Sequence, residues 1–98
     1  MKRCALSKAL CALAPGAVIA RRVEHGWHSA TFAGQRVMLD LVWDAPEADV
    51  EAFAAMLSKH EFADADLLVV DIVVTQQTRA ADGATVLSIE ALLLEDEV

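Results

Sequence analysis

The sequence predicts an α+β domain in which a helix, two strands, a second helix and two further strands follow one another. Three observations support this order: an apolar stripe at helical spacing near the N-terminus, an amphipathic segment over 46–60, and two β-branched runs around Asp82 and Gly83. Two antiparallel pairs joined by a crossing helix favour one antiparallel sheet of four or five strands, with the helices mainly on one face.

The size and composition favour one compact domain over residues 1–98 that associates with another chain. Of the 98 residues, 56% are hydrophobic, which is the opposite of a disordered composition. A domain of this size buries only about two thirds of the surface of its unfolded chain. The apolar surplus therefore indicates a homo-oligomer, in the simplest case a dimer.

The net charge of -7 conceals a strong asymmetry along the chain. Residues 1–36 carry six Lys or Arg and one Glu, whereas residues 37–98 carry two basic and fourteen acidic side chains. This polarity can steer two copies together or attract a basic partner, and it is also typical of a solvated acidic surface that aids solubility. The acidic excess argues against nucleic-acid binding, which needs clustered Lys and Arg.

Residues 2–14 are expected to form the first helix, since Leu6 and Leu10 belong to a stripe repeating every three or four residues. Pro15 disfavours helical geometry in the residue before it and so ends the helix. A basic start followed by an apolar run resembles a short signal peptide, but Lys8 interrupts that run. A packed helix is the better interpretation.

Cys4 and Cys11 are expected on one side of this helix, too far apart to bridge each other. We interpret them as small apolar side chains in a reducing compartment, with an intermolecular disulfide or a reactive thiol as open alternatives. No run reaches the ~18 apolar residues of a membrane span. We therefore expect a cytoplasmic protein without membrane contact.

Two or three strands are expected between residues 17 and 43. Over 17–32 the pattern fits either one long bulged strand or two strands that turn at His25 and Gly26. The hairpin is expected to close at Ala33 and Gly34. Apolar residues at every second position of 37–43 then predict a strand with one buried face.

The second helix is expected over 46–60. Asp44 is the expected N-cap, with Pro46 in the first turn and Glu47 completing a capping box. Acidic residues near the start and basic residues near the end suit the helix dipole. The apolar stripe consists of Val50, Phe53, Ala54 and Leu57.

The final hairpin is expected to turn at Asp82 and Gly83 with a two-residue loop. That register places one apolar set on a single face: Leu68, Val70, Ile72, Val74, Leu87, Ile89, Ala91 and Leu93. At one end the opposite face is also apolar. Its residues, expected to contact a partner, are Val69, Val73, Leu92 and Leu94.

Candidate chemistry is sparse, and we assign no catalytic residue, cofactor or metal ligand. The serines and glycines match no nucleophile-elbow, phosphate-loop or dinucleotide pattern. His25 and His28 lack a third ligand for a metal. Asp71 and Glu90 share a face in the expected register, about 13 Å apart by strand rise, which is too far for two carboxylates acting on one bond.

The leading hypothesis is a small non-catalytic protein of unknown process that forms a homodimer and acts as a protein-interaction module. One alternative is a small-molecule binder or minor enzyme with a pocket between sheet and helix, lined by His28, Trp43, Asp71 and Glu90. Another is an acidic antitoxin, immunity or inhibitor protein with a basic target.

Overall fold

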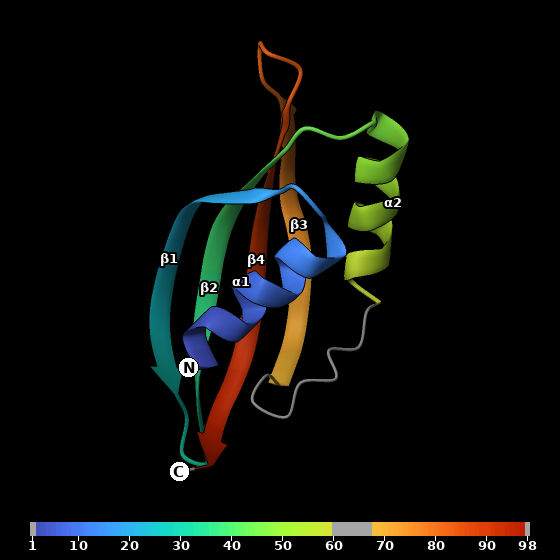
Figure 1. The fold of residues 1–98 in the computed structure, drawn as a ribbon. Helices are drawn as coiled ribbons and strands as arrows, with labels where there is room; N and C mark the ends of the chain where they lie inside the picture. Colours follow the sequence, from blue (N-terminus) through green and yellow to red (C-terminus); the bar gives the residue numbers. More distant parts are fainter. Residues whose placement is uncertain (1, 60–67, 98) are drawn as a thin grey trace.

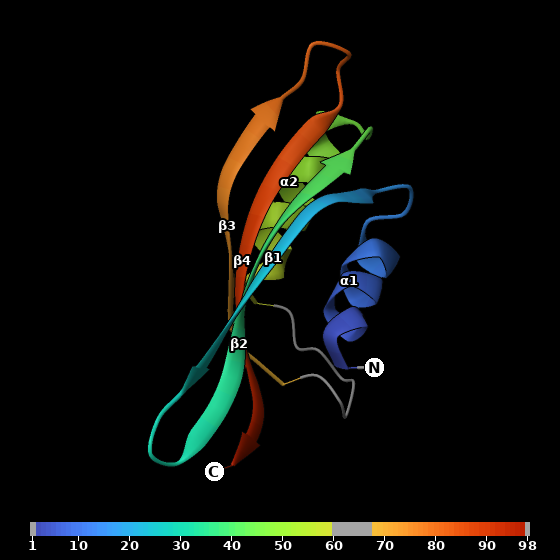
Figure 2. The ribbon, with the colours of Figure 1, turned by 90° about the vertical axis from the view of Figure 1, so that its left-hand side faces the viewer.

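The computed structural model describes residues 2–59 and 68–97 and confirms the predicted element order. The four strands form one antiparallel sheet in the order β1-β2-β4-β3. Both helices lie on the same side of this sheet (Figures 1 and 2). The elements are α1 (Lys2–Leu13), β1 (Val18–His28), β2 (Phe32–Trp43), α2 (Glu47–Leu57), β3 (Leu68–Arg79) and β4 (Thr85–Glu97).

Helix α1 ends as the proline predicts. The last helical residue is Leu13, and the amide of Ala14 donates to the Leu10 carbonyl at 2.9 Å before Pro15 interrupts the pattern. Leu6 and Leu10 are fully buried, so the expected apolar stripe is the face that packs on the sheet.

Strand β1 is one long bulged strand rather than two. Its bulge lies between Ile19 and Arg21, whereas Gly26 pairs regularly with Gln35. A bulge places an extra residue in one strand and bends it. The strand therefore continues through His25 and Gly26, where a turn was the alternative.

The first hairpin closes earlier than predicted. The loop lies over 29–31, where the Ser29 amide donates to the Phe32 carbonyl at 2.7 Å and the Ser29 Oγ accepts from the Phe32 amide at 3.2 Å. A serine hydroxyl that bonds the local backbone can make a turn without glycine. The predicted turn at Ala33 and Gly34 is wrong, because both residues lie inside β2.

Gly34 instead allows the Trp27 ring and the backbone of β4 to lie close to β2. It pairs with Trp27 on β1, and a Cβ added at this position would collide with the Trp27 ring and with the Leu93 carbonyl oxygen. A side chain here would displace either the ring or the backbone of β4.

Helix α2 is shorter than predicted, running from Glu47 to Leu57, and residue 60 lies outside the described residues. The predicted N-cap is also wrong: Pro46 occupies that position, with φ of -56° and no side-chain cap, while Asp44 is exposed in the preceding segment. The Pro46 carbonyl accepts from the Val50 amide at 3.1 Å. Proline's fixed φ suits the chain just before a helix, so the backbone starts the helix without a side-chain cap.

The β3–β4 hairpin has a three-residue loop, not the predicted two-residue turn. The Ala80 amide donates to the Ala84 carbonyl at 2.7 Å, and the Gly83 amide donates to the Ala80 carbonyl at 3.0 Å. Gly83 has a φ of +93°, as expected for a turn closed by a glycine bulge. The extra loop residue changes the pairing of the whole hairpin.

Two bulges in β3 change the register further. One lies at Thr75 and returns Ile72 and Val74 to the predicted face, although they pair with Ala91 and Ile89, two residues from the predicted partners. The other lies at Val70, which is 56% exposed rather than buried as predicted. Beyond this bulge, Leu68 pairs with Leu94. The predicted register paired even-numbered residues of β3 with odd-numbered residues of β4, so this pair differs from it.

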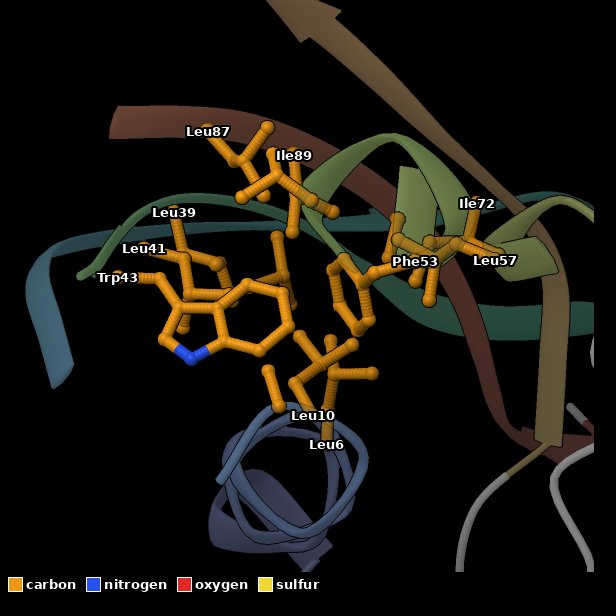
Figure 3. Close-up of a cluster of buried hydrophobic side chains, with 14 of the residues drawn as sticks. Leu6, Leu10, Leu39, Leu41, Trp43, Phe53, Leu57, Ile72, Leu87 and Ile89 are labelled. Carbon is orange, nitrogen blue, oxygen red and sulfur yellow. The ribbon is translucent and has the colours of Figure 1, made fainter. Parts of the chain in front are cut away.

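The core lies between the helices and one face of the sheet. Figure 3 shows leucines of α1 and Phe53 of α2 pointing toward the side chains of β2 and β4. The Trp43 Nε1 donates to the Pro15 carbonyl at 2.9 Å, which ties the end of α1 to β2. The Trp43 and Phe53 rings meet edge to face at 5.6 Å and 70°.

Candidate functional site: the open face of the sheet

The side of the sheet away from the helices carries the side chains that the core does not use. We call it the open face. Strand pairing arranges its residues in rows across the sheet. In the strand order β1, β2, β4, β3 these rows are Val18-Val42-Val86-Thr78, Arg21-Asp40-Ser88-Gln76, Val23-Met38-Glu90-Val73 and His25-Arg36-Leu92-Asp71, and Trp27-Gly34-Leu94 continue the same alternation.

Apolar side chains occupy about half of the open face. Val18 is 62% exposed, Val73 40% and Met38 36%. Further members of the face, all half-buried, are Val23, Trp27, Val42, Val86, Leu92 and Leu94. So many apolar side chains on one surface are typical of a contact site rather than of an ordinary solvated face.

The charged residues of the open face are divided between its two halves. Arg21 and Arg36 lie on β1 and β2, whereas Asp71 and Glu90 lie on β3 and β4. The Arg36 Nε is 3.3 Å from the Glu90 Oε1, so one ion pair joins the halves. Asp40 departs from this division, since it is an acidic residue on β2.

The middle of the open face is hollowed. The hollow has a volume of about 350 Å³ and is lined from all four strands. Its polar side chains include Arg21, His25, Asp40 and Glu90, and the Ser88 Oγ donates to the Asp40 Oδ1 at 2.9 Å. Among residues 2–59 and 68–97, no three His, Cys, Asp or Glu side chains gather as a metal site would require.

Three of the four expected interface residues lie on the open face: Val73, Leu92 and Leu94. The fourth, Val69, pairs with Leu93 and packs against the core on the helix side. The bulge at Val70 is the reason, since one extra residue reverses the side to which the preceding side chain points.

The structure does not bring the four expected pocket residues together. Trp43 is buried in the core, and His28 is exposed at the end of β1. Asp71 and Glu90 do share the open face, where Asp71 pairs with Leu92 and Glu90 with Val73. The two carboxylates are therefore diagonal neighbours, and the predicted separation of four residues is wrong because it assumed a two-residue loop and a ladder without bulges.

The space between helices and sheet is filled by core side chains rather than by the expected pocket. A groove of about 540 Å³ lies at the rim, between α2 and β3, with Ala54, Ala55 and Ser58 on its helix side. None of the four expected pocket residues lines this groove. Its lining is mostly small side chains and amides without a charged group.

Sequence reasoning missed the β2 contribution to the open face, namely Arg36, Met38 and Asp40. The period-two pattern does mark these residues as the outward positions of a strand. Their importance depends on which strands lie beside β2, however, and neighbours are not encoded in the alternation of a single strand. The order β1-β2-β4-β3 joins them to Ser88 and Glu90.

Comparison with protein-family models, with curated proteins and with solved structures finds no match to this chain. The part of the chain that the structure describes has no helix long and apolar enough to cross a membrane.

Proposed function

We propose that the protein is a non-catalytic interaction module that forms a homodimer through the open face. The observation that carries this proposal is the exposure of Val18, Met38 and Val73 on a sheet face that neither α1 nor α2 covers. Burying such side chains removes apolar surface from water, worth about 25 cal/mol per Å².

The size of the open face suits a dimer interface. Four strands of 11 to 13 residues form the sheet. At a strand spacing of about 4.8 Å and a rise of about 3.3 Å per residue, such a sheet measures about 19 Å by about 36 Å, or roughly 700 Å². Stable interfaces bury about 800 Å² per partner, so the face is near the standard size.

The edges of the sheet are less suitable for association than its face. Strand β1 has a bulge at Ala20, and β3 has bulges at Val70 and Thr75. Bulges interrupt the row of backbone donors and acceptors to which another strand would pair, and natural sheets use them against edge-to-edge contact. This supports packing of one face on another rather than extension of the sheet.

The polar residues of the open face favour binding over catalysis. Ser88 is hydrogen-bonded to the Asp40 carboxylate, but the imidazole of His25, which would have to lie between them in a Ser-His-Asp arrangement, lies on β1, two strands from β4. At the usual strand spacing this is about 10 Å, too far for a base to activate a hydroxyl. The free, half-buried thiol of Cys11 favours a reducing compartment, and we propose the cytoplasm.

A charged substitution at Val73 tests the proposal. Val73→Asp places a carboxylate in the apolar part of the interface, once in each subunit, and we expect it to weaken the dimer at least about tenfold in Kd, or ~1.4 kcal/mol. Light scattering over a wide concentration range measures the mass, and circular dichroism checks the fold. Ala52→Asp, on the exposed side of α2, is the control.

The wild-type protein and the control are expected to change from dimer to monomer at the same concentration, while Val73→Asp stays folded and remains monomeric up to a concentration at least about tenfold higher. A wild-type protein that is monomeric at every concentration contradicts the proposal. A Val73→Asp variant with the mass of the wild-type dimer does so too.

The hollow favours a second candidate function, the binding of a small polar molecule. Its volume of about 350 Å³ lies within the range of about 300–1,000 Å³ of ligand sites. Arg21 and Glu90 present opposite charges in it, which suits a zwitterion such as an amino acid. Isothermal titration with free amino acids tests this candidate, and Ser88→Val is expected to abolish any binding.

A further inference from the structure

We propose that the two copies pack face to face about a two-fold axis parallel to the strands. The β1–β2 half of each copy then covers the β4–β3 half of its partner. This inference rests on the proposed homodimer and adds the orientation of the second copy. The pattern of charged and apolar side chains over the open face supports this orientation.

The division of charge is the first argument. Among the described residues of the open face, the β4–β3 half has the carboxylates Asp71 and Glu90 and no basic side chain. The β1–β2 half has Arg21 and Arg36. An arrangement that places unlike halves together pairs opposite charges in both copies at once, because each contact of a two-fold dimer occurs twice.

The arrangement of the open face in rows predicts which residues of the two copies meet. A two-fold axis parallel to the strands places each row over the same row of the partner, reversed in strand order. His25 then lies over the partner's Asp71, since both belong to one row. Arg36 lies beside the same carboxylate, and sheets that pack face to face are about 10 Å apart, a gap that long side chains span.

The apolar residues agree with this orientation. In the middle row Val23 lies over the partner's Val73, and in the first row Val42 lies over the partner's Val86. Apolar side chains therefore meet in rows on either side of the Arg21 row, while Met38 lies over the partner's Glu90, a carboxylate already paired with Arg36 of its own chain. Contacts of this kind supply the stabilising part of an interface, while the charges select its orientation.

A two-fold axis perpendicular to the strands also brings apolar residues together, with Met38 over the partner's Met38, but it places like charges opposite one another. It places each strand over its own copy and reverses the order of the rows around the middle one. Glu90 would then lie over the partner's Glu90 and His25 over the partner's Arg21, whereas Arg36 would lie over the partner's Asp40. Like charges opposite one another in a partly buried interface destabilise it.

Two single substitutions, mixed together, test the orientation. The contact tested is the one between Arg36 of one copy and Asp71 of the other, which occurs twice in the dimer. Arg36→Asp makes both residues of this contact acidic, and Asp71→Arg makes both of them basic. Each variant alone is therefore expected to weaken its homodimer about tenfold. In a mixed dimer, the introduced carboxylate at position 36 of one copy meets the introduced guanidinium at position 71 of the other. The second contact keeps its native pair of Arg36 and Asp71, so both contacts have opposite charges.

Both positions are expected to accept these changes without loss of the fold. Asp71 is exposed, and the Arg36 side chain is 57% exposed. Arg36→Asp also removes the ion pair with Glu90 of the same chain, an exposed pair whose loss is expected to leave the monomer folded. Circular dichroism and thermal unfolding of the dilute single variants check that each monomer is intact.

Sedimentation equilibrium and native mass spectrometry, with one variant isotope-labelled, give the result. We expect weak homodimers of each variant and a mixed dimer within about threefold of the wild-type Kd, or ~0.7 kcal/mol. The controls Lys8→Asp and Asp49→Arg make comparable charge changes on exposed helix positions and are expected to leave the wild-type dimer unchanged, alone or mixed.

The outcomes separate the two proposals. A wild-type dimer whose variants do not recover on mixing overturns the orientation and leaves the homodimer in place. A wild-type protein that is monomeric at all concentrations overturns the homodimer itself. Raising the salt concentration is expected to weaken the wild-type dimer, since exposed charge pairs are screened.

Discussion

The two faces of one sheet differ sharply although the same strands build them. In β4, Leu87 and Ile89 point toward the helices and are at most 1% exposed, while their neighbours Ser88 and Glu90 are half-buried and polar. The helix face has the composition of a core. The open face mixes apolar and charged side chains, as an interface does when it must also be stable in water before association.

The largest expected effect is a difference in unfolding free energy between truncations on the two faces. Leu87→Ala removes a fully buried side chain and is expected to lower the free energy of unfolding by about 2–5 kcal/mol. Met38→Ala, at a position that is 36% exposed, is expected to cost less than about 1 kcal/mol in the monomer. Urea unfolding at concentrations below the dimer Kd measures both. Equal costs would contradict the assignment of core and open face.

Two glycines of neighbouring strands sharpen the comparison. Gly34→Ala adds a Cβ that collides with the Trp27 ring and the Leu93 carbonyl oxygen, and is expected to cost about 1–3 kcal/mol. Gly26→Ala meets only the end of the Gln35 side chain at 3.8 Å, so a change within about 1 kcal/mol is expected, with stabilisation from the stiffer unfolded chain. Thermal unfolding of the two variants checks this order. A tolerated Gly34→Ala would refute the close packing of Trp27.

The two tryptophans, one on each face of the sheet, compare the faces through their indole N–H groups. Trp43→Phe removes the hydrogen bond to the Pro15 carbonyl and is expected to cost about 1–3 kcal/mol. The Trp27 Nε1 is buried and has no hydrogen-bond partner among the described residues, so Trp27→Phe removes an unsatisfied donor and is expected to change the monomer by less than about 1 kcal/mol. Unfolding of the dilute monomers measures both. A larger loss for Trp27→Phe would reverse the comparison.

The helix side of the fold was predictable from the sequence because each helix carries its own signal. The stripe that includes Leu6 and Leu10 and the stripe that includes Val50 and Phe53 each identify the face that is buried. Helical periodicity depends on residues within a few positions of one another. Local pattern was therefore enough for both helices and for the order of the elements.

The turns and the pairing of the strands were less predictable, for physical reasons specific to a few residues. Ser29 closes the first hairpin through its own backbone and hydroxyl bonds, so the glycine at 34 did not mark the turn. Bulges at Val70 and Thr75 follow from the fit of the whole ladder and not from a local signal. Each bulge reverses the alternation.

The open face could be predicted only in part because it is a property of four strands together. Val73, Leu92 and Leu94 were expected on it from the apolar character of the last hairpin. Arg36 and Met38 join them because β2 lies next to β4 rather than at an edge. The local pattern of each hairpin does not determine which of its strands will pair with the other hairpin.

The oxidation of two methionines tests the central claim most directly, since one chain contains both the probe and its control. Met38 lies on the open face, and Met56 packs against the core from α2. Peroxide oxidation, followed by mass spectrometry of peptides, reports the exposure of each sulfur. We expect the oxidation rate of Met38 to fall as protein concentration rises through the dimer Kd, while the rate of Met56 stays constant. A rate for Met38 that does not change with concentration would contradict burial of the open face in a dimer.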